Sequence, residues 1–111
     1  MVRAQALILN PSGLHARPAA EFVREAKRFL SHVRIRNLDL PEEAAVNAKN
    51  VMAVLSLGIG PGCTVELETE GPDEEDAAQA LVSLIRSGIG EPVPETAEAE
   101  EETSDPESET E

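Results

Sequence analysis

The pattern of apolar and polar positions along the chain predicts seven elements of secondary structure. Two segments alternate between apolar and charged residues, which is typical of strands with one buried face, and turn residues bound a further apolar run near the start of the chain. The expected strands occupy residues 4–10, 32–38, about 44–46 and 64–70. Elsewhere apolar residues recur three and four positions apart, as on one face of a helix. The expected helices occupy residues 17–30, 47–58 and 72–88.

Individual residues mark the ends of these helices. Pro18 suits the first turn of the first helix, where its missing N–H is not needed. Asn47 or Asn50 can cap the second helix and Asp73 the third, because their side-chain oxygens accept hydrogen bonds from unpaired N–H groups. A glycine, Gly88, is expected to stop the last helix. Each helix therefore has a local signal at one or both ends.

The order of the elements, β-α-β-β-α-β-α, indicates the fold class. Strands with one charged face and one apolar face need helices on a single side of the sheet. We therefore expect an α+β fold, an open-faced β-sandwich in which a four-stranded, mainly antiparallel sheet carries three helices on one face. The residues expected to face the core are Val33, Ile35, Val65 and Leu67 from the strands, and positions 19, 22, 23, 26, 29 or 30, 77, 78, 81, 84 and 85 from the helices.

Charge divides the chain into two parts. The net charge of the 111 residues is −13, but residues 91–111 contain ten of the 22 acids and no lysine or arginine. The remaining 12 acids oppose nine bases, so residues 1–90 carry a net charge of −3. The last 21 residues have too few apolar side chains to offset the entropy of ordering. We therefore expect one folded domain at 1–90 and an acidic, disordered tail at 91–111.

Several classes of function are excluded by composition. No apolar run approaches the roughly 20 residues that span a bilayer, and no secretory leader is present, so we expect a cytoplasmic protein that does not insert into membranes. The single cysteine, Cys63, allows no internal disulfide and has no second thiol for a metal site. No basic stripe with stacking aromatics indicates nucleic acid, and no glycine-rich loop indicates a nucleotide cofactor.

Candidate chemistry lies at His15 and Arg17, within the segment NPSGLHARPAAEF. Pro18 restricts the residue before it, which places the helix start near residue 16 and His15 at or just before the first turn. The partial positive charge there disfavours imidazolium, so we expect a neutral imidazole with a nucleophilic lone pair. A phosphoryl group on His15 would accept hydrogen bonds from the N–H groups of Ala16 and Arg17, and the guanidinium fork suits phosphate oxygens.

The structural alternative is that His15 is a turn residue hydrogen-bonded to the backbone and that Arg17 is an ordinary surface charge. Most single histidines are not catalytic, and the pattern of residues alone leaves this alternative open. His32, the other histidine, is interpreted structurally, because it lies between a helix and a strand without an adjacent anion-binding feature.

Two segments, GLHARPAAEFV and NAKNVMAVLSLGI, together resemble HPr, the histidine-containing phosphocarrier family of the bacterial phosphoenolpyruvate-dependent sugar phosphotransferase system. The resemblance covers about residues 1–88 and keeps the family's element order. It implies the open-faced β-sandwich inferred above, and a monomeric phosphoryl carrier rather than an enzyme. It also implies that His15 accepts a phosphoryl group on Nδ1 from enzyme I and passes it to IIA domains of sugar permeases, and that Arg17 assists this transfer.

The second segment of the resemblance concerns docking. Val51, Met52 and Leu55 match an exposed apolar patch on the middle helix of the family, which docks both enzyme I and the IIA domains. A patch that contains methionine can adapt to several surfaces. The alternative for such residues is core packing, which we expect instead for Val54 and Leu57.

The chain departs from the family pattern in two places. Many Gram-positive members begin the middle helix with a serine that a regulatory kinase phosphorylates, whereas this chain has Asn50. Asparagine caps a helix about as well as serine but has no hydroxyl to phosphorylate, which puts that form of regulation in doubt. The acidic tail extends past the usual end of the family, and no family role applies to it.

Three other functions are weighed against the sugar phosphocarrier. The nearest is a regulatory paralogue, whose phosphorylation state controls carbon or nitrogen metabolism without sugar transport. A hydrolase with His15 as nucleophile would need a water-activating base near it, and the sequence offers none. A binding module whose His15 is never phosphorylated is disfavoured by the presence of both His15 and Arg17.

Overall fold

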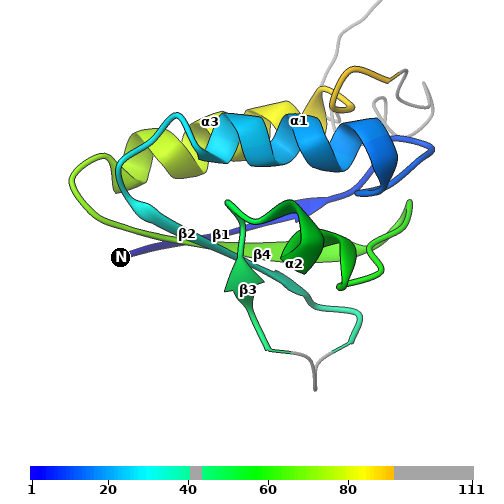
Figure 1. The fold of residues 1–111 in the computed structure, drawn as a ribbon, viewed down its shortest axis with the longest axis horizontal. Helices are drawn as coiled ribbons and strands as arrows, with labels where there is room; N and C mark the ends of the chain where they lie inside the picture. Colours follow the sequence, from blue (N-terminus) through cyan, green and yellow to red (C-terminus); the bar gives the residue numbers. More distant parts are fainter. Residues whose placement is uncertain (41–43, 92–111) are drawn as a thin grey trace, which may run out of the picture.

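The computed structural model describes residues 1–40 and 44–91, in which four strands and three helices follow one another in the predicted order. Two long helices lie side by side over the sheet, and the short α2 lies on the same side next to β3 (Figure 1). This arrangement confirms the expected open-faced β-sandwich. The elements are β1 (Val2–Leu7), α1 (Ala16–Ala26), β2 (His32–Asn37), β3 (Val46–Asn47), α2 (Val51–Leu55), β4 (Thr64–Glu70) and α3 (Glu74–Arg86).

The sheet has the strand order β1-β4-β2-β3, and every neighbouring pair is antiparallel. The last strand along the chain, β4, therefore lies between β1 and β2. Leu67, in the middle of β4, is opposite Ala4 on one side and Ile35 on the other. The sheet is thus held together by its last strand, and β1 and β3 form its two edges.

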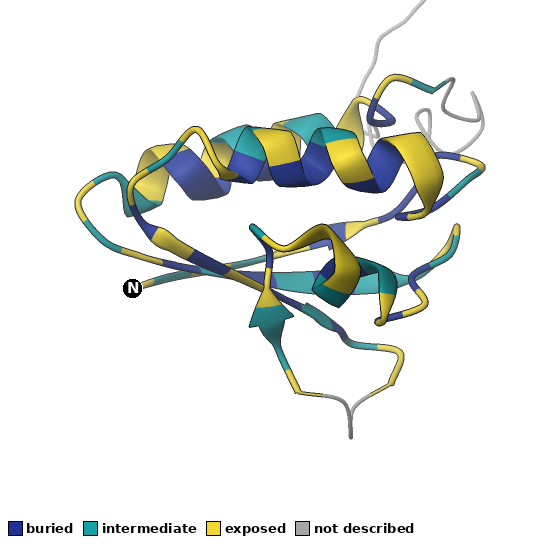
Figure 2. Cartoon of the chain, in the orientation of Figure 1, coloured by how far each residue is buried: buried dark blue, intermediate teal, exposed yellow. Residues whose placement is uncertain are grey.

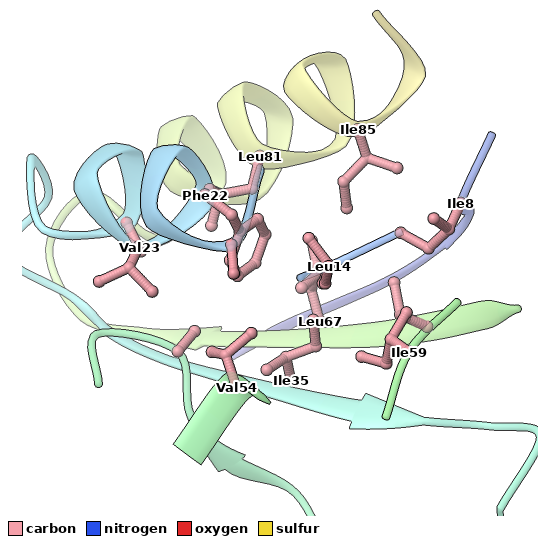
Figure 3. Close-up of a cluster of buried hydrophobic side chains, with 14 of the residues drawn as sticks. Ile8, Leu14, Phe22, Val23, Ile35, Val54, Ile59, Leu67, Leu81 and Ile85 are labelled. Atoms are coloured by element: carbon pink, nitrogen blue, oxygen red, sulfur yellow. The ribbon is translucent and has the colours of Figure 1, made fainter. Parts of the chain in front are cut away.

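The core lies between the inner face of the sheet and the helices, as the alternation of buried and exposed positions shows (Figures 2 and 3). The four strand residues predicted to face inward are all buried. Phe22 of α1 and Leu81 of α3 are fully buried, and their side chains lie next to each other on the side of the helices that faces the sheet. Burial of aliphatic and aromatic side chains supplies about 25 cal/mol for each Å² removed from water, so this layer is the main source of stability.

The bounds of several elements differ from the predictions: β3 covers Val46–Asn47 rather than about 44–46, and the differences are largest in β1, α1 and α2. The first strand covers Val2–Leu7 rather than 4–10, because Ile8 bonds instead to the segment before β4, where its N–H donates to the Cys63 carbonyl at 2.8 Å. Helix α1 ends at Ala26 rather than 30, which leaves Leu30 exposed in the following loop. Helix α2 is also shorter than expected and covers only Val51–Leu55.

The two predicted caps behave differently. Asn50 caps α2 as expected, because its Oδ1 accepts a hydrogen bond from the Ala53 N–H at 3.1 Å. Asp73 occupies the cap position of α3, but its side chain makes no capping hydrogen bond. Its carboxylate instead accepts bonds from the N–H groups of Leu30 and Ser31, both at 2.9 Å, and from the Ser31 hydroxyl. The prediction for Asp73 was therefore wrong about its partner, since the preferred donors lie 42 and 43 residues away.

These hydrogen bonds join the loop after α1 to the loop before α3, and they are sensitive to acid. The Ser31 hydroxyl, and then the Leu30 N–H, hold the pKa of Asp73 below its usual range, because both stabilise the charged carboxylate. A carboxyl whose pKa is lower in the folded state stabilises that state above its unfolded pKa. The contribution of Asp73 is therefore present at neutral pH and is lost as the pH falls through the lowered value.

No helix within the described residues is both long enough and apolar enough to cross a membrane. The predicted tail is outside the described part of the chain from residue 92 onward. The boundary at residue 90 and the disorder of the tail stay predictions.

Candidate functional site

His15 lies immediately before α1, with its side chain exposed. Its backbone is extended (φ −127°, ψ 160°), and its imidazole makes no capping hydrogen bond to the helix. The structure therefore places His15 at the start of the first helix, as the sequence predicts. The first N–H groups of a helix have no carbonyl partner within the helix. An anion on the imidazole would thus lie next to free donors.

The residue after His15 has a conformation that the sequence did not predict. Ala16 has a φ of +51°, in the left-handed region, although it is the first residue of α1. A residue with a Cβ in this region costs roughly 1–2 kcal/mol. The chain therefore turns sharply between His15 and Arg17, and the side chains of both residues are exposed.

A tight turn before His15 fixes the position of the histidine. Asn10 closes this turn, because its carbonyl accepts a hydrogen bond from the Gly13 N–H at 3.1 Å and its buried side chain donates to the Gly13 carbonyl at 2.9 Å. The N–H of Leu14 then donates to the Ile59 carbonyl at 2.9 Å, and the Leu14 side chain is fully buried. The histidine is therefore held by a core residue and by the loop that follows α2.

The side chain of Arg17 is 59% exposed and makes one long ion pair. Its Nη1 lies 3.8 Å from Oε2 of Glu21, one turn further along α1, and Arg24 lies 3.9 Å from the same oxygen. Exposed ion pairs of this kind contribute little to stability. The guanidinium can therefore leave Glu21 when a more highly charged partner binds near His15.

The predicted docking patch is only partly exposed. Met52 is 70% exposed and Val51 is 36% exposed, whereas Leu55 is half-buried and packs against the core. Val54 and Leu57 are buried, as predicted. Helix α2 contacts α1, so the patch and His15 lie on adjoining elements (Figure 1). Its docking role stays a prediction.

The site also contains Glu91, which no local sequence pattern indicates. One carboxylate oxygen of Glu91 accepts hydrogen bonds from the Asn10 side chain and the Ser12 N–H, both at 3.1 Å, and the other accepts one from the Ser12 hydroxyl at 2.8 Å. The bonds from Asn10, then those from Ser12, hold the pKa of Glu91 below its usual range. The sequence predicts residue 91 as the first residue of the acidic tail, and the structure shows that its side chain contacts the turn before His15. No local pattern marks a contact that spans about 80 residues.

Comparison with known proteins identifies the class of this fold and site. Residues 2–87 match a family described as "PTS HPr component phosphorylation site". The chain belongs to this HPr family of the phosphotransferase system, and its relatives include proteins named phosphocarrier protein HPr, which carry phosphoryl groups and are not enzymes themselves.

Three relatives show how the chain compares with individual proteins. It is 46% identical to the HPr-like protein Crh of Halalkalibacterium halodurans, over 77% of this chain and 96% of that protein. It is 48% identical to the multiphosphoryl transfer protein of Vibrio cholerae over 76% of this chain, but it spans only 21% of that protein. The crystal structure of HPr from Thermoanaerobacter tengcongensis superposes with a TM-score of 0.77 at 44% identity, over 84% of this chain and all of that one.

Proposed function

We propose that this protein accepts a phosphoryl group on Nδ1 of His15 from enzyme I, which obtains it from phosphoenolpyruvate, and passes it to IIA domains of sugar permeases. The observation that carries the proposal is the exposed imidazole of His15 at the start of α1 in a chain of the HPr family. In the transfer, the imidazole lone pair forms a bond to phosphorus while the bond between phosphorus and the donor breaks. The onward transfer reverses these roles.

The start of α1 supports both halves of this exchange. The N–H groups of Ala16 and Arg17 precede the first complete turn of the helix and are donors for phosphoryl oxygens. The guanidinium of Arg17 adds a positive charge that can move, because its ion pair with Glu21 is long and exposed. A phosphoryl group held by a few exposed donors can be accepted and released quickly, as a carrier requires.

Incubation with phosphoenolpyruvate and enzyme I, followed by intact-mass measurement, tests the proposal. We expect the mass to rise by one phosphoryl group, and the added group to be lost in acid, as a phosphoramidate is. A protein that gains no mass under conditions in which a known HPr is phosphorylated would contradict the proposal.

Arg17→Ala is expected to slow transfer from enzyme I by about ten- to a hundredfold, because one charge-assisted hydrogen bond to the phosphoryl group is lost. A time course of phosphorylation, with samples quenched at successive times, measures this rate. Arg24→Ala is the matched control, since Arg24 pairs with the same Glu21 oxygen but lies two turns along α1. Equal rates for the two variants would show that Arg17 is only a surface charge.

We also propose that the exposed side chains of α2, Val51 and Met52 together with the outer part of Leu55, dock enzyme I and the IIA domains. The support is their exposure beside α1 and their match to the docking patch of the family. The interfaces are expected to be small, since each partner must leave after transfer. We also propose that the protein is a monomer that acts in the cytoplasm, as its resemblance to the HPr family implies.

Met52→Asp is expected to raise the KM for transfer from enzyme I by roughly tenfold and to change kcat little, because it puts a charge into the proposed interface and leaves His15 intact. Steady-state phosphorylation at several carrier concentrations separates the two constants. Gln79→Asp, which adds a charge on the exposed face of α3, is the control. An unchanged KM in Met52→Asp would remove α2 from the docking surface.

A second candidate is a regulatory HPr-like protein, whose phosphorylation state controls carbon or nitrogen metabolism without sugar transport. Its support is the 46% identity to the HPr-like protein Crh. The two functions differ in the onward step. Transfer of the phosphoryl group from His15 to an isolated IIA domain would support the carrier, whereas a phosphorylated protein that fails this transfer would favour the regulator.

A further inference from the structure

The end of α3 directs the chain back to the turn before His15. Gly88, Ile89 and Gly90 have φ values of +92°, +50° and +81°, so three successive residues lie in the left-handed region. Ile89 is fully buried in the core, and its N–H donates to the Leu84 carbonyl at 3.2 Å. The N–H of Glu91 in turn donates to the Gly88 carbonyl at 2.9 Å. The position of Glu91 is therefore fixed by the core and by the backbone.

At this position the carboxylate of Glu91 meets three donors. Two belong to Ser12, through its N–H and its hydroxyl, and the third is the side-chain amide of Asn10. The same amide nitrogen also donates to the Gly13 carbonyl, so the turn and the carboxylate share a buried donor. Because Ser12 is three residues before His15, the contact stabilises the segment that places the histidine.

The carboxylate of Glu91 also lies near the charge that would bind a phosphoryl group. A Cβ at Gly90 would stand only 3.0 Å from Nη1 of Arg17, so the guanidinium reaches the backbone next to Glu91. The charge of Arg17 contributes to the lowered pKa of Glu91, after the hydrogen bonds from Asn10 and Ser12. Two carboxylates therefore act on the Arg17 guanidinium: that of Glu91, and that of Glu21, whose Oε2 lies 3.8 Å from Nη1.

We propose that Glu91 is a positioning residue of the phosphoryl-acceptor site: it holds the turn before His15 and limits how much of the Arg17 charge a phosphoryl group can use. This inference rests on the proposed phosphorylation of His15. In the unphosphorylated protein the charges of Glu91 and Arg17 attract each other. A phosphoryl group on His15 adds negative charge near Glu91 and competes for the same guanidinium. Glu91 therefore weakens retention of the phosphoryl group and favours its release to the next acceptor.

The first test needs no phosphorylation. In a pH titration of the full chain followed by ¹H–¹⁵N NMR, the Ser12 amide signal is expected to follow the ionisation of Glu91, at a pKa below the usual glutamate range. Glu91→Gln keeps the size of the side chain but removes the charge, so this titration should disappear. Glu25→Gln is the control, because Glu25 pairs with Arg28 at 3.0 Å on α1 and contacts neither Ser12 nor Arg17. It should leave the Ser12 titration unchanged.

The second test measures retention of the phosphoryl group. At a fixed ratio of phosphoenolpyruvate to pyruvate, with enzyme I present, the phosphorylated fraction reports the exchange equilibrium. Glu91→Gln is expected to shift this equilibrium about two- to fivefold toward the phosphorylated protein, the usual scale for exposed charges. Glu91→Asp, which keeps the charge, should move the equilibrium back toward the wild-type value, and Glu25→Gln should not shift it.

The two tests separate failure of this inference from failure of the proposed function. If the wild-type protein takes up no phosphoryl group, the proposed function is wrong, while the Ser12 titration still reports whether the contact exists. If the wild-type protein is phosphorylated and Glu91→Gln has the same exchange equilibrium, the positioning role is overturned even when the Ser12 contact is present. A Ser12 amide that titrates identically in wild type and Glu91→Gln also overturns it.

Discussion

His15→Ala is expected to abolish uptake of acid-labile phosphate and to leave the free energy of unfolding within about 0.5 kcal/mol of the wild-type value. The side chain is exposed and makes no capping hydrogen bond, so its removal takes no contact from the core. The nucleophile is lost completely, because the methyl group of alanine has no lone pair. Intact-mass measurement after incubation with phosphoenolpyruvate and enzyme I, together with urea unfolding, measures both effects.

The chain provides a matched control for this variant in its second histidine. His32 is also exposed and begins β2, at the other end of α1 from His15. His32→Ala should therefore keep full phosphate uptake. Phosphate uptake by the His15→Ala protein, or loss of uptake in the His32→Ala protein, would show that His15 is not the acceptor.

Gly13→Ala is expected to reduce the free energy of unfolding by roughly 2–4 kcal/mol, as the sum of backbone strain and overpacking. Gly13 has a φ of +61°, where a side chain is strained. A Cβ there would also stand 2.5 Å from the Ile59 carbonyl oxygen and 2.7 Å from the Gly60 Cα. Both are backbone atoms of the loop against which the turn before His15 packs, so neither can move away freely. Urea unfolding measures the loss.

Gly58→Ala separates the two causes of this loss. Gly58 has nearly the same φ, +62°, but no atom lies within 4 Å of a Cβ at that position. Its replacement should therefore cost about 1–2 kcal/mol from backbone strain alone. Equal losses for the two variants would show that the loop at Ile59 and Gly60 moves aside. The larger loss for Gly13→Ala should be accompanied by slower phosphorylation of His15, because the turn before it must shift.

The features that were predicted correctly depend on short stretches of chain. Apolar residues alternate with polar ones around Leu67 and recur at helical spacing around Phe22. Each pattern indicates an element with one buried face, and both residues are in the core. Asn50 caps α2 by bonding to a residue three positions away. His15 was placed by the proline and the turn that flank it. In all these cases the physical cause lies within a few residues of its effect.

The features that were missed depend on contacts between distant segments. Asp73 has the composition of a cap, but the donors of the loop at Ser31 bind its carboxylate instead. Glu91 has the sequence context of the first residue of an acidic tail. Its contact with Ser12 depends on Ile89, which is buried in the core two residues before it. The left-handed Ala16 joins α1 to the segment at Gly13 and Leu14, where the Leu14 N–H bonds to the distant Ile59 carbonyl. None of these is visible in a local pattern of residues.

The place of β4 in the sheet has a consequence for synthesis of the protein. Because β4 lies between β1 and β2, neither of these strands has its main partner until residue 70 has left the ribosome. Synthesis from Leu7 to Glu70 takes about 3 to 13 seconds at typical translation rates. During that time β1 is a short strand with both edges unpaired, open to pairing with another nascent chain. Slower translation before β4 should therefore increase the yield of misassembled protein, whereas the completed fold protects one edge of β1 permanently.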